Sequence, residues 1–331
     1  MAIKSPKELY RHATENHYGL GAFNTFSWET MMAVMEAAQA AKSPAILQVS
    51  MGARKYAGHF KEYVDTLYTL AEQYEVPFFV QHDHCGTFEA CREAIEAGCQ
   101  AVMFDGSHLP YEQNVKETRQ VVEYAHEKGV WVEAELGCLP GFEDLVFSEK
   151  AVYTDPDLAA RFIDRTGCDA LAVAVGTSHG GVRSEDYLPL DFELLEEIVK
   201  QKPDYPFVLH GAASLPPKLI DACNRQGGQV EYLRNCSEES IARAVALGVK
   251  KVNMDVDNFL VFTTAIREFF NTSPDVYDPR KYLKPARDAF RMEVEHKMKE
   301  VLNSAGRYPE VKERSREAQD KKSPCAGEGI L

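Results

Sequence analysis

Eight short apolar runs alternate with longer helical patterns up to about residue 270 of this 331-residue chain. Short runs rich in branched and aromatic residues predict β-strands, and apolar residues at helical spacing predict helices. Repeated strand–helix units build a parallel sheet, and eight of them can close into a barrel. The sequence therefore predicts the α/β class and a (β/α)8 TIM barrel. The runs are LGAFNTF (20–26), PAILQVS (44–50), VPFFVQHDH (76–84), AVMFDGS (101–107), VWVEAELG (130–137), ALAVAVG (170–176), PFVLHGA (206–212) and KVNMDV (251–256).

The chain is longer than an average domain, but a barrel of this kind commonly forms one domain of about 250 residues or more. We therefore predict a single barrel domain over residues 1–305. Its last part, about 271–305, reads as additional C-terminal helices. Residues 306–331 form a charged tail whose composition suits disorder.

Composition excludes several classes of partner and environment. The net charge of −14 argues against nucleic acid and against anionic membrane surfaces. The longest apolar stretches are strand-sized, far below the roughly 20 residues that span a bilayer. The eight cysteines form no Cys-x-x-Cys pair, and the start MAIKSPKELYRHA lacks the apolar core of a signal peptide. These features predict reduced thiols and a cytoplasmic protein.

Three histidines, His84, His179 and His210, each close a strand-like run, at spacings of 95 and 31 residues. A lone histidine at a strand end is more often a hydrogen-bonded core or surface residue. In a barrel, however, the C-terminal ends of the strands surround one mouth. Three imidazoles with an open fourth position are typical of a catalytic zinc site. Further polar residues stand at or near the ends of the runs: Asn24, Ser50, Asp83, Asp105, Glu133, Glu135, Asn253 and Asp255.

Two features at the strand ends can be interpreted in more than one way. They are the acidic residues Asp105 and Glu135 and the QHDH segment at 81–84. Asp105 and Glu135 could be helix caps or partners of basic residues, or they could contact a metal. In a regular strand His82 and His84 point to the same face and Asp83 to the other. The His-x-His pair alone suggests a barrel hydrolase. For Asp83 and His84 to serve one site, the backbone must leave strand geometry there, and Gly86 makes this plausible.

Loops and small residues add further candidates. Residues 137–157 are too long and polar for a simple connection, and such loops are often functional lids. Small residues follow two of the histidines, in His179-Gly180-Gly181 and in His210-Gly211-Ala212-Ala213-Ser214. Glycine lets backbone N–H groups approach an anion closely, so either turn could bind phosphate or could be an ordinary tight turn.

At these residues the chain resembles the class II, zinc-dependent ketose-bisphosphate aldolases, in particular the fructose-1,6-bisphosphate branch. The resemblance covers about residues 5 to 305. The motifs that carry it lie in the family's order: HDHCGTFEACREAIEAGCQAVMFDGSHLPYEQN, VEAELG, YTDPDLAARFIDRTGCDALAVAVGTSHG, LHGAAS, VNMDVD and YDPRKYLKPAR.

The resemblance implies a role for each matching position. His84, His179 and His210 would bind the catalytic Zn²⁺, with Asp83 as the acid/base at the C4 oxygen. Asp105 and Glu135 would hold a second cation, and Glu143 in the long loop would take part in proton transfer. Arg280 would reach a phosphate in a neighbouring subunit, which implies a homo-oligomer, a dimer or tetramer. The predicted substrate contacts are Asn24, Ser50, Gly180, Gly181, Gly211, Ser214, Asn253, Asp255 and Arg280.

The implied reaction is reversible cleavage of fructose 1,6-bisphosphate, a sugar phosphate, to dihydroxyacetone phosphate and glyceraldehyde 3-phosphate. A monovalent cation, Na⁺ or K⁺, would sit near the donor phosphate. Ala213 and Val256 stand where the family usually has hydroxyl residues, although Ser214 could replace one of these. Tagatose bisphosphate or a less phosphorylated ketose is therefore an alternative substrate. A zinc hydrolase using His82 and His84 and a non-catalytic sugar-phosphate binder are alternatives of other classes.

Overall fold

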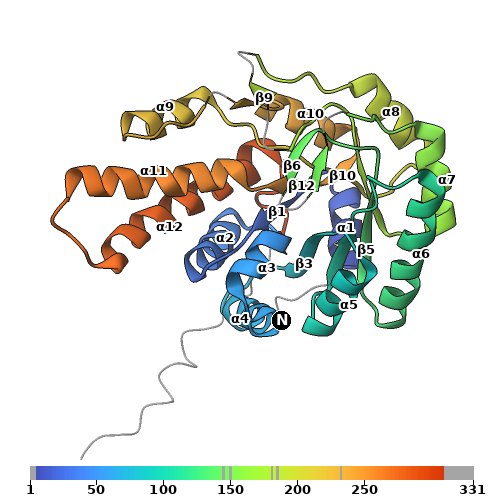
Figure 1. Ribbon diagram of the computed structural model, residues 1–331, viewed down its shortest axis with the longest axis horizontal. Helices are drawn as coiled ribbons and strands as arrows, with labels where there is room; N and C mark the ends of the chain where they lie inside the picture. Colours follow the sequence, from blue (N-terminus) through green and yellow to red (C-terminus); the bar gives the residue numbers. More distant parts are fainter. Residues whose placement is uncertain are drawn as a thin grey trace, which may run out of the picture.

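The computed structural model describes residues 5–143, 146–148, 151–179, 182–183, 186–231 and 233–308. Its centre is a closed barrel of parallel strands in the order β1-β12-β10-β8-β5-β4-β3-β2 (Figure 1). Every predicted run contributes one barrel strand, so the predicted (β/α)8 barrel is confirmed. The strands are β1 (Leu20–Asn24), β2 (Ala45–Val49), β3 (Phe78–Cys85), β4 (Ala101–Phe104), β5 (Trp131–Leu136), β8 (Ala170–Val173), β10 (Phe207–Leu209) and β12 (Val249–Met254).

Helices surround the barrel and extend beyond it. The helices between the strands are α2 (Trp28–Ala41), α3 (Met51–Ala57), α4 (Phe60–Ala71), α5 (Phe88–Ala97), α6 (Tyr111–Glu127), α7 (Pro156–Thr166), α8 (Phe192–Gln201), α9 (Pro217–Arg225) and α10 (Glu238–Leu247). The remaining helices are α1 (Pro6–Glu15) before the barrel, and α11 (Val256–Thr272), α12 (Pro279–His296) and the π-helix η1 (Lys297–Val301) after it.

Local sequence signals set the ends of these helices. The Ser27 and Thr87 side chains accept hydrogen bonds from backbone N–H groups in the first turns of α2 and α5, as N-cap residues do. Gly98 ends α5 with a left-handed φ of 103°. At the end of α2, Lys42 takes the left-handed conformation, with φ 51°, in the place where glycine is most common.

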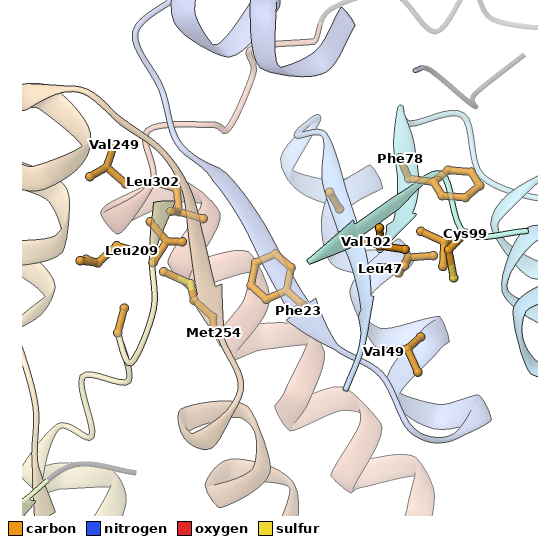
Figure 2. Close-up of a cluster of buried hydrophobic side chains, with 14 of the residues drawn as sticks. Phe23, Leu47, Val49, Phe78, Cys99, Val102, Leu209, Val249, Met254 and Leu302 are labelled. Atoms are coloured by element: carbon orange, nitrogen blue, oxygen red, sulfur yellow. The ribbon is translucent and has the colours of Figure 1, made fainter. Parts of the chain in front are cut away.

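The hydrophobic core lies between the barrel and its helices. Figure 2 shows part of it, with Phe23 of β1, Leu47 of β2 and Val102 of β4 among its side chains. The N-terminal end of the barrel is closed by α1, whose Tyr10 ring stacks on Trp131 of β5 at 5.0 Å. The opposite end, where the strands finish, is the mouth that carries the polar residues.

Several segments lie outside the regular barrel pattern. The loop after β5 contains a short hairpin, β6 (Gly141–Glu143) with β7 (Val146–Ser148), and β9 (Val182–Arg183) pairs with β11 (Leu233–Arg234). Helices α11 and α12 form a hairpin that projects from the barrel (Figure 1). No helix in the described part of the chain is long and apolar enough to span a membrane. The predicted tail lies outside the described residues from 309 onwards.

Candidate metal centre and active site

The backbone of β3 changes direction at its last residues, and this decides which side chains face the mouth. His84 has a positive φ of 47°, and the pairing of β3 with β4 shifts register between His82 and Cys85. Positive φ is uncommon for residues other than glycine and is often found at functional sites. The strict alternation that would separate Asp83 from His84 is therefore broken. The departure occurs at His84 itself, whereas φ at Gly86 is not positive.

Three buried imidazoles converge in the mouth. Ring nitrogens of His84, His179 and His210 lie within 4.8 Å of one another, and His210 Nδ1 is 3.0 Å from His84 Nε2. Burial, with the other two imidazoles beside it, lowers the pKa of His179 well below its ordinary value. Burial also lowers the pKa of His210, although Glu133 opposes the shift. Neutral imidazoles are the form that binds a metal.

Carboxylates stand behind two of these imidazoles. Asp105 Oδ2 lies 2.9 Å from His84 Nδ1, and Glu133 Oε1 lies 2.7 Å from His210 Nε2. A carboxylate on one ring nitrogen fixes the tautomer, so that the other nitrogen is left as a metal ligand. His84 therefore presents Nε2 and His210 presents Nδ1 to the same point.

A buried lysine supports one of these carboxylates. Lys251 Nζ lies 2.7 Å from Glu133 Oε2, and Gln81 donates to the same oxygen at 2.9 Å. Burial alone would raise the pKa of Glu133, but Lys251 and His210 outweigh it and hold that pKa below its usual value. Glu133 is therefore ionised where it contacts His210. A buried charge of this kind requires such partners.

The Asp83 carboxylate sits beside the imidazoles and is held by amides. Gln48 and Asn253 donate to Asp83 Oδ2 at 2.9 and 3.0 Å, and His84 Nε2 is 3.7 Å away. Asp83 Oδ1 has no hydrogen-bond partner among the described residues, although Lys251 Nζ lies 3.9 Å from it. Asp83 thus keeps one oxygen available next to the imidazole cluster.

The pKa values of Asp105 and Glu135 are shifted in opposite directions. Burial alone would raise the pKa of Asp105, but hydrogen bonds from His84 and Ser107 hold it well below its usual value. Burial and the neighbouring Asp105 raise the pKa of Glu135 well above its usual value. Glu135 Oε2 is buried with no hydrogen-bond partner among the described residues. His84, Asp105 and Glu135 form a second group that could hold a cation.

These donors suit a divalent metal. Imidazole nitrogens with nearby carboxylate oxygens are the ligands that zinc and related transition metals prefer. A bound cation would satisfy the converging ring nitrogens and the Glu135 oxygen that has no hydrogen bond among the described residues.

A pocket adjoins the imidazoles and is closed by strand ends and one loop. Its lining residues are Asn24, Gln48, His84, His179, Gly211, Ala212, Ala213, Asn253, Asp255 and Val256. Burial raises the pKa of Asp255 to about 6, although Val256 N and the Asn24 side chain donate to its carboxylate. Gly211 has φ 57°, and a Cβ there would lie 2.7 Å from the carbonyl oxygen of Ser178. Only glycine fits this turn without displacing that neighbour.

Comparisons with known proteins identify the family. The model of the family described as fructose-bisphosphate aldolase class-II matches residues 4–307. The chain belongs to this family. A fructose-bisphosphate aldolase of Treponema pallidum is 41% identical over 327 residues, which cover 93% of this chain and 98% of the relative. A fructose-bisphosphate aldolase of Thermus caldophilus is 42% identical over 302 residues, covering 91% and 98%.

Solved structures show the same architecture. The YdjI aldolase of Escherichia coli K12 has a TM-score of 0.74 and 28% identity, covering 93% of this chain and 100% of that one. A putative fructose-1,6-bisphosphate aldolase from Coccidioides immitis has a TM-score of 0.77 and 25% identity, covering 92% and 98%. The fold and the family predicted from the sequence are both confirmed.

The alternative interpretation, a zinc hydrolase, requires His82 as a metal ligand. In this member of the class II aldolase family, His82 does not face the other imidazoles. The His82 ring packs edge-on against Phe60 of α4, with ring centroids 5.0 Å apart. His82 Nδ1 contacts the backbone carbonyl of Asp83 and lies 3.1 Å from Cys85 Sγ. His82 is therefore directed towards the helices, and none of the metal-competent groups in the described residues includes it.

Ser50 and Ser214 are predicted substrate contacts, but in this structure their hydroxyls form hydrogen bonds with other groups of the protein. Ser50 caps α3 by accepting a hydrogen bond from Ala53 N at 3.2 Å. Ser214 is fully buried, donates to Asp257 at 2.7 Å and accepts from Lys297 at 2.7 Å. The Ser214 hydroxyl therefore takes part in a buried network in this structure, and its proposed role as a replacement for a phosphate-binding hydroxyl stays a prediction.

The remaining predicted residues do not line the pocket or lie outside the described residues. Arg280 lies at the start of α12, with its side chain 90% exposed and paired with Asp278. Gly180, Gly181 and the side chain of Glu143 lie outside the described residues. The strand that carries Glu143 begins at Gly141, which forms a β-bridge with His179.

Sequence reasoning missed several residues that hold the aldolase site together. Gln48, Gln81 and Lys251 are buried in barrel strands and contact Asp83 or Glu133. Strand periodicity carries the signal for Lys251, because it shares a face with Asn253 and Asp255. A lysine on the inner face of a barrel strand needs a buried acidic partner.

Proposed function

We propose that this aldolase catalyses metal-dependent, reversible cleavage of fructose 1,6-bisphosphate to dihydroxyacetone phosphate and glyceraldehyde 3-phosphate. One observation carries the proposal: three imidazoles converge in the barrel mouth, with the Asp83 carboxylate 3.7 Å from His84 Nε2. The relatives named fructose-bisphosphate aldolase support this choice of substrate.

The metal of the proposed site is zinc, held by His84 Nε2, His210 Nδ1 and His179. When bound, Zn²⁺ would stabilise negative charge on the enediolate oxygens by several kcal/mol. Asp105 and Glu135 would hold a second cation. A monovalent cation, Na⁺ or K⁺, would lie near Gly211 and Asp255.

Asp83 is the proposed acid/base. In the cleavage direction its carboxylate accepts the proton of the C4 hydroxyl as the C3–C4 bond breaks, and in condensation it returns that proton. Gln48 and Asn253 donate to Oδ2 and so orient the other oxygen, Oδ1, for this transfer. Glu143, on the hairpin next to His179, would move the second proton, at C3 of the donor half.

The two phosphates would bind at different places. The donor phosphate would accept hydrogen bonds from backbone N–H groups of the turns at Gly180, Gly181 and Gly211, with Asn24, Asn253 and Asp255 beside them. Arg280 would reach the other phosphate in a second subunit. Its exposed position, on the α11–α12 hairpin that projects from the barrel, supports a homo-oligomer, a dimer or tetramer (Figure 1). We also propose a cytoplasmic location.

A second substrate is favoured by a specific observation. The pocket wall carries the side chains of Ala213 and Val256, and the Ser214 hydroxyl is bound within the Asp257 and Lys297 network. None of these three side chains therefore offers a hydroxyl to the donor phosphate. A ketose that is less phosphorylated at the donor end, or tagatose bisphosphate, is the alternative.

One assay separates these possibilities. Zinc-reconstituted enzyme is tested with fructose and tagatose bisphosphates and with their monophosphates, and kcat/KM is compared. The proposal expects the highest value for fructose 1,6-bisphosphate, loss of activity with a chelator, and no inactivation by borohydride with substrate. Full activity after thorough metal removal would refute the metal-dependent reaction, and a higher kcat/KM for a monophosphate would replace the substrate.

A further inference from the structure

A buried lysine lies behind the loop that lines the pocket. Lys297 is 1% exposed and begins the π-helix η1. Its Nζ lies 2.7 Å from Asp257 Oδ2 and 3.2 Å from Glu293 Oε1, and it donates to Ser214 Oγ at 2.7 Å. It also pairs with Glu238. The lysine therefore joins η1 to the ends of three other elements.

The loop that Lys297 contacts has a strained backbone. Gly211 and Leu215 both have positive φ, 57° and 43°. For leucine this conformation is costly and persists only when its surroundings fix it. Asp257 does so, because it accepts hydrogen bonds from the backbone N of Ser214 at 3.1 Å and of Leu215 at 2.8 Å. The Ser214 hydroxyl adds a third bond to the same carboxylate.

Asp257 is a buried acidic side chain, so it needs a partner of opposite charge. It is 3% exposed, and a buried charge without a partner is strongly destabilising. Lys297 supplies that partner. Burial alone would lower the pKa of Lys297, but Asp257, Glu293 and Glu238 outweigh it and raise that pKa above its usual value. The lysine is therefore charged.

Asp257 also connects the two walls of the pocket. One wall is the loop with Gly211, Ala212 and Ala213, and the other includes Asp255 and Val256. Asp257 follows Val256 directly in the chain and bonds to Ser214 and Leu215, the two residues that follow Ala213. The Asp257 carboxylate, neutralised by Lys297, therefore links the two walls in addition to the pairing of β10 with β12.

We propose that Lys297 is a positioning residue for the aldol reaction. By holding Asp257 against the amides of Ser214 and Leu215, it fixes the loop that would bind the donor phosphate. This inference rests on the proposed function. Lys297 would act on binding of the donor half, because the carboxylate of Asp83 is held by different side chains, those of Gln48 and Asn253.

The test compares Lys297→Met with Lys299→Met. Lys299 lies on the same π-helix, pairs with Glu295 and is 47% exposed, so it is a matched control for loss of charge. For K297M we expect KM for fructose 1,6-bisphosphate and the dissociation constant of dihydroxyacetone phosphate to rise roughly 10- to 100-fold, the effect of losing a hydrogen-bonded charge. We expect kcat to change less than threefold or so and zinc content to stay the same. K299M should match the wild type.

Hydrogen exchange gives a readout independent of activity. The amides of Ser214 and Leu215 should exchange faster in K297M, while those of β10 keep their protection. Unchanged exchange with unchanged KM would overturn the proposal, as would a fall in kcat at constant KM. Wild-type enzyme that neither cleaves fructose 1,6-bisphosphate nor binds dihydroxyacetone phosphate would refute the proposed function, whereas the exchange result would still test the contact between Lys297 and the loop.

Two further variants decide the matter if K297M does not fold. Ser214→Ala keeps every charge but removes the hydroxyl between Lys297 and Asp257, and Lys297→Arg keeps the positive charge. The proposal expects S214A to raise KM and loop exchange in the same direction by a smaller factor, and K297R to retain most of the protection. Wild-type KM and exchange in S214A would overturn it.

Discussion

Replacing Glu133 by glutamine tests how the barrel orients its metal ligands. In the wild type, Glu133 accepts from His210 Nε2 at 2.7 Å and from Lys251 at 2.7 Å. A glutamine of the same size turns an N–H₂ group towards one of these two donors. In either orientation the His210 ring loses the carboxylate that fixes its tautomer, and Lys251 loses the buried negative charge that neutralises it.

The size of the effect follows from these contacts. Loss of a carboxylate behind a metal-binding histidine typically weakens metal binding about 10- to 100-fold. This corresponds to about 1.4–2.8 kcal/mol. Breaking the buried pair with Lys251 should also lower the free energy of unfolding of the metal-free protein by about 3–5 kcal/mol. We expect both changes in E133Q.

Zinc affinity is measured by competition with a fluorescent chelator, and stability by urea denaturation of the metal-free protein. Glu123→Gln is the control, because Glu123 forms an exposed pair with Arg119 on α6. Surface pairs contribute about 0–1 kcal/mol, so E123Q should behave as wild type. If E133Q binds zinc within twofold of the wild type and is equally stable, Glu133 does not orient His210. The assignment of His210 Nδ1 as a zinc ligand would then be refuted.

Three further predictions concern the same mouth. His179→Ala should lose zinc, whereas His82→Ala should keep it because His82 packs against α4; the reverse result, measured by metal content, would restore the hydrolase interpretation. Asp83→Asn should bind zinc and substrate but cleave about 10²- to 10⁴-fold more slowly, and single-turnover rates close to wild type would show that another group moves the proton. Burial raises the pKa of Asp255 to about 6 from 3.8, so the folded enzyme gains a proton there as pH falls through about 6. If substrate needs the carboxylate ionised, kcat/KM should fall with it, and Asp255→Asn should remove this acid limb of the pH profile; an unchanged limb would assign it to another group.

The sequence by itself determined the barrel and most of the residues at its mouth. Strand formation depends on local patterns of branched and apolar residues, and parallel strands joined by helices place all their C-terminal ends together. For that reason Asn24, Asp105 and Asp255 could be expected at one end of the barrel from their positions in the runs alone. The family motifs then indicated the chemistry.

The tertiary structure decided how individual side chains point. Periodicity directs Asp83 and His84 to opposite faces, but the positive φ at His84 brings both into the mouth. Such a conformation is imposed by the surrounding packing, which no local pattern encodes. The direction of the Ser214 hydroxyl also depends on Lys297, which lies 83 residues away in the chain. Contacts between such distant residues exist only after the chain has folded, so they could not be predicted from the order of residues.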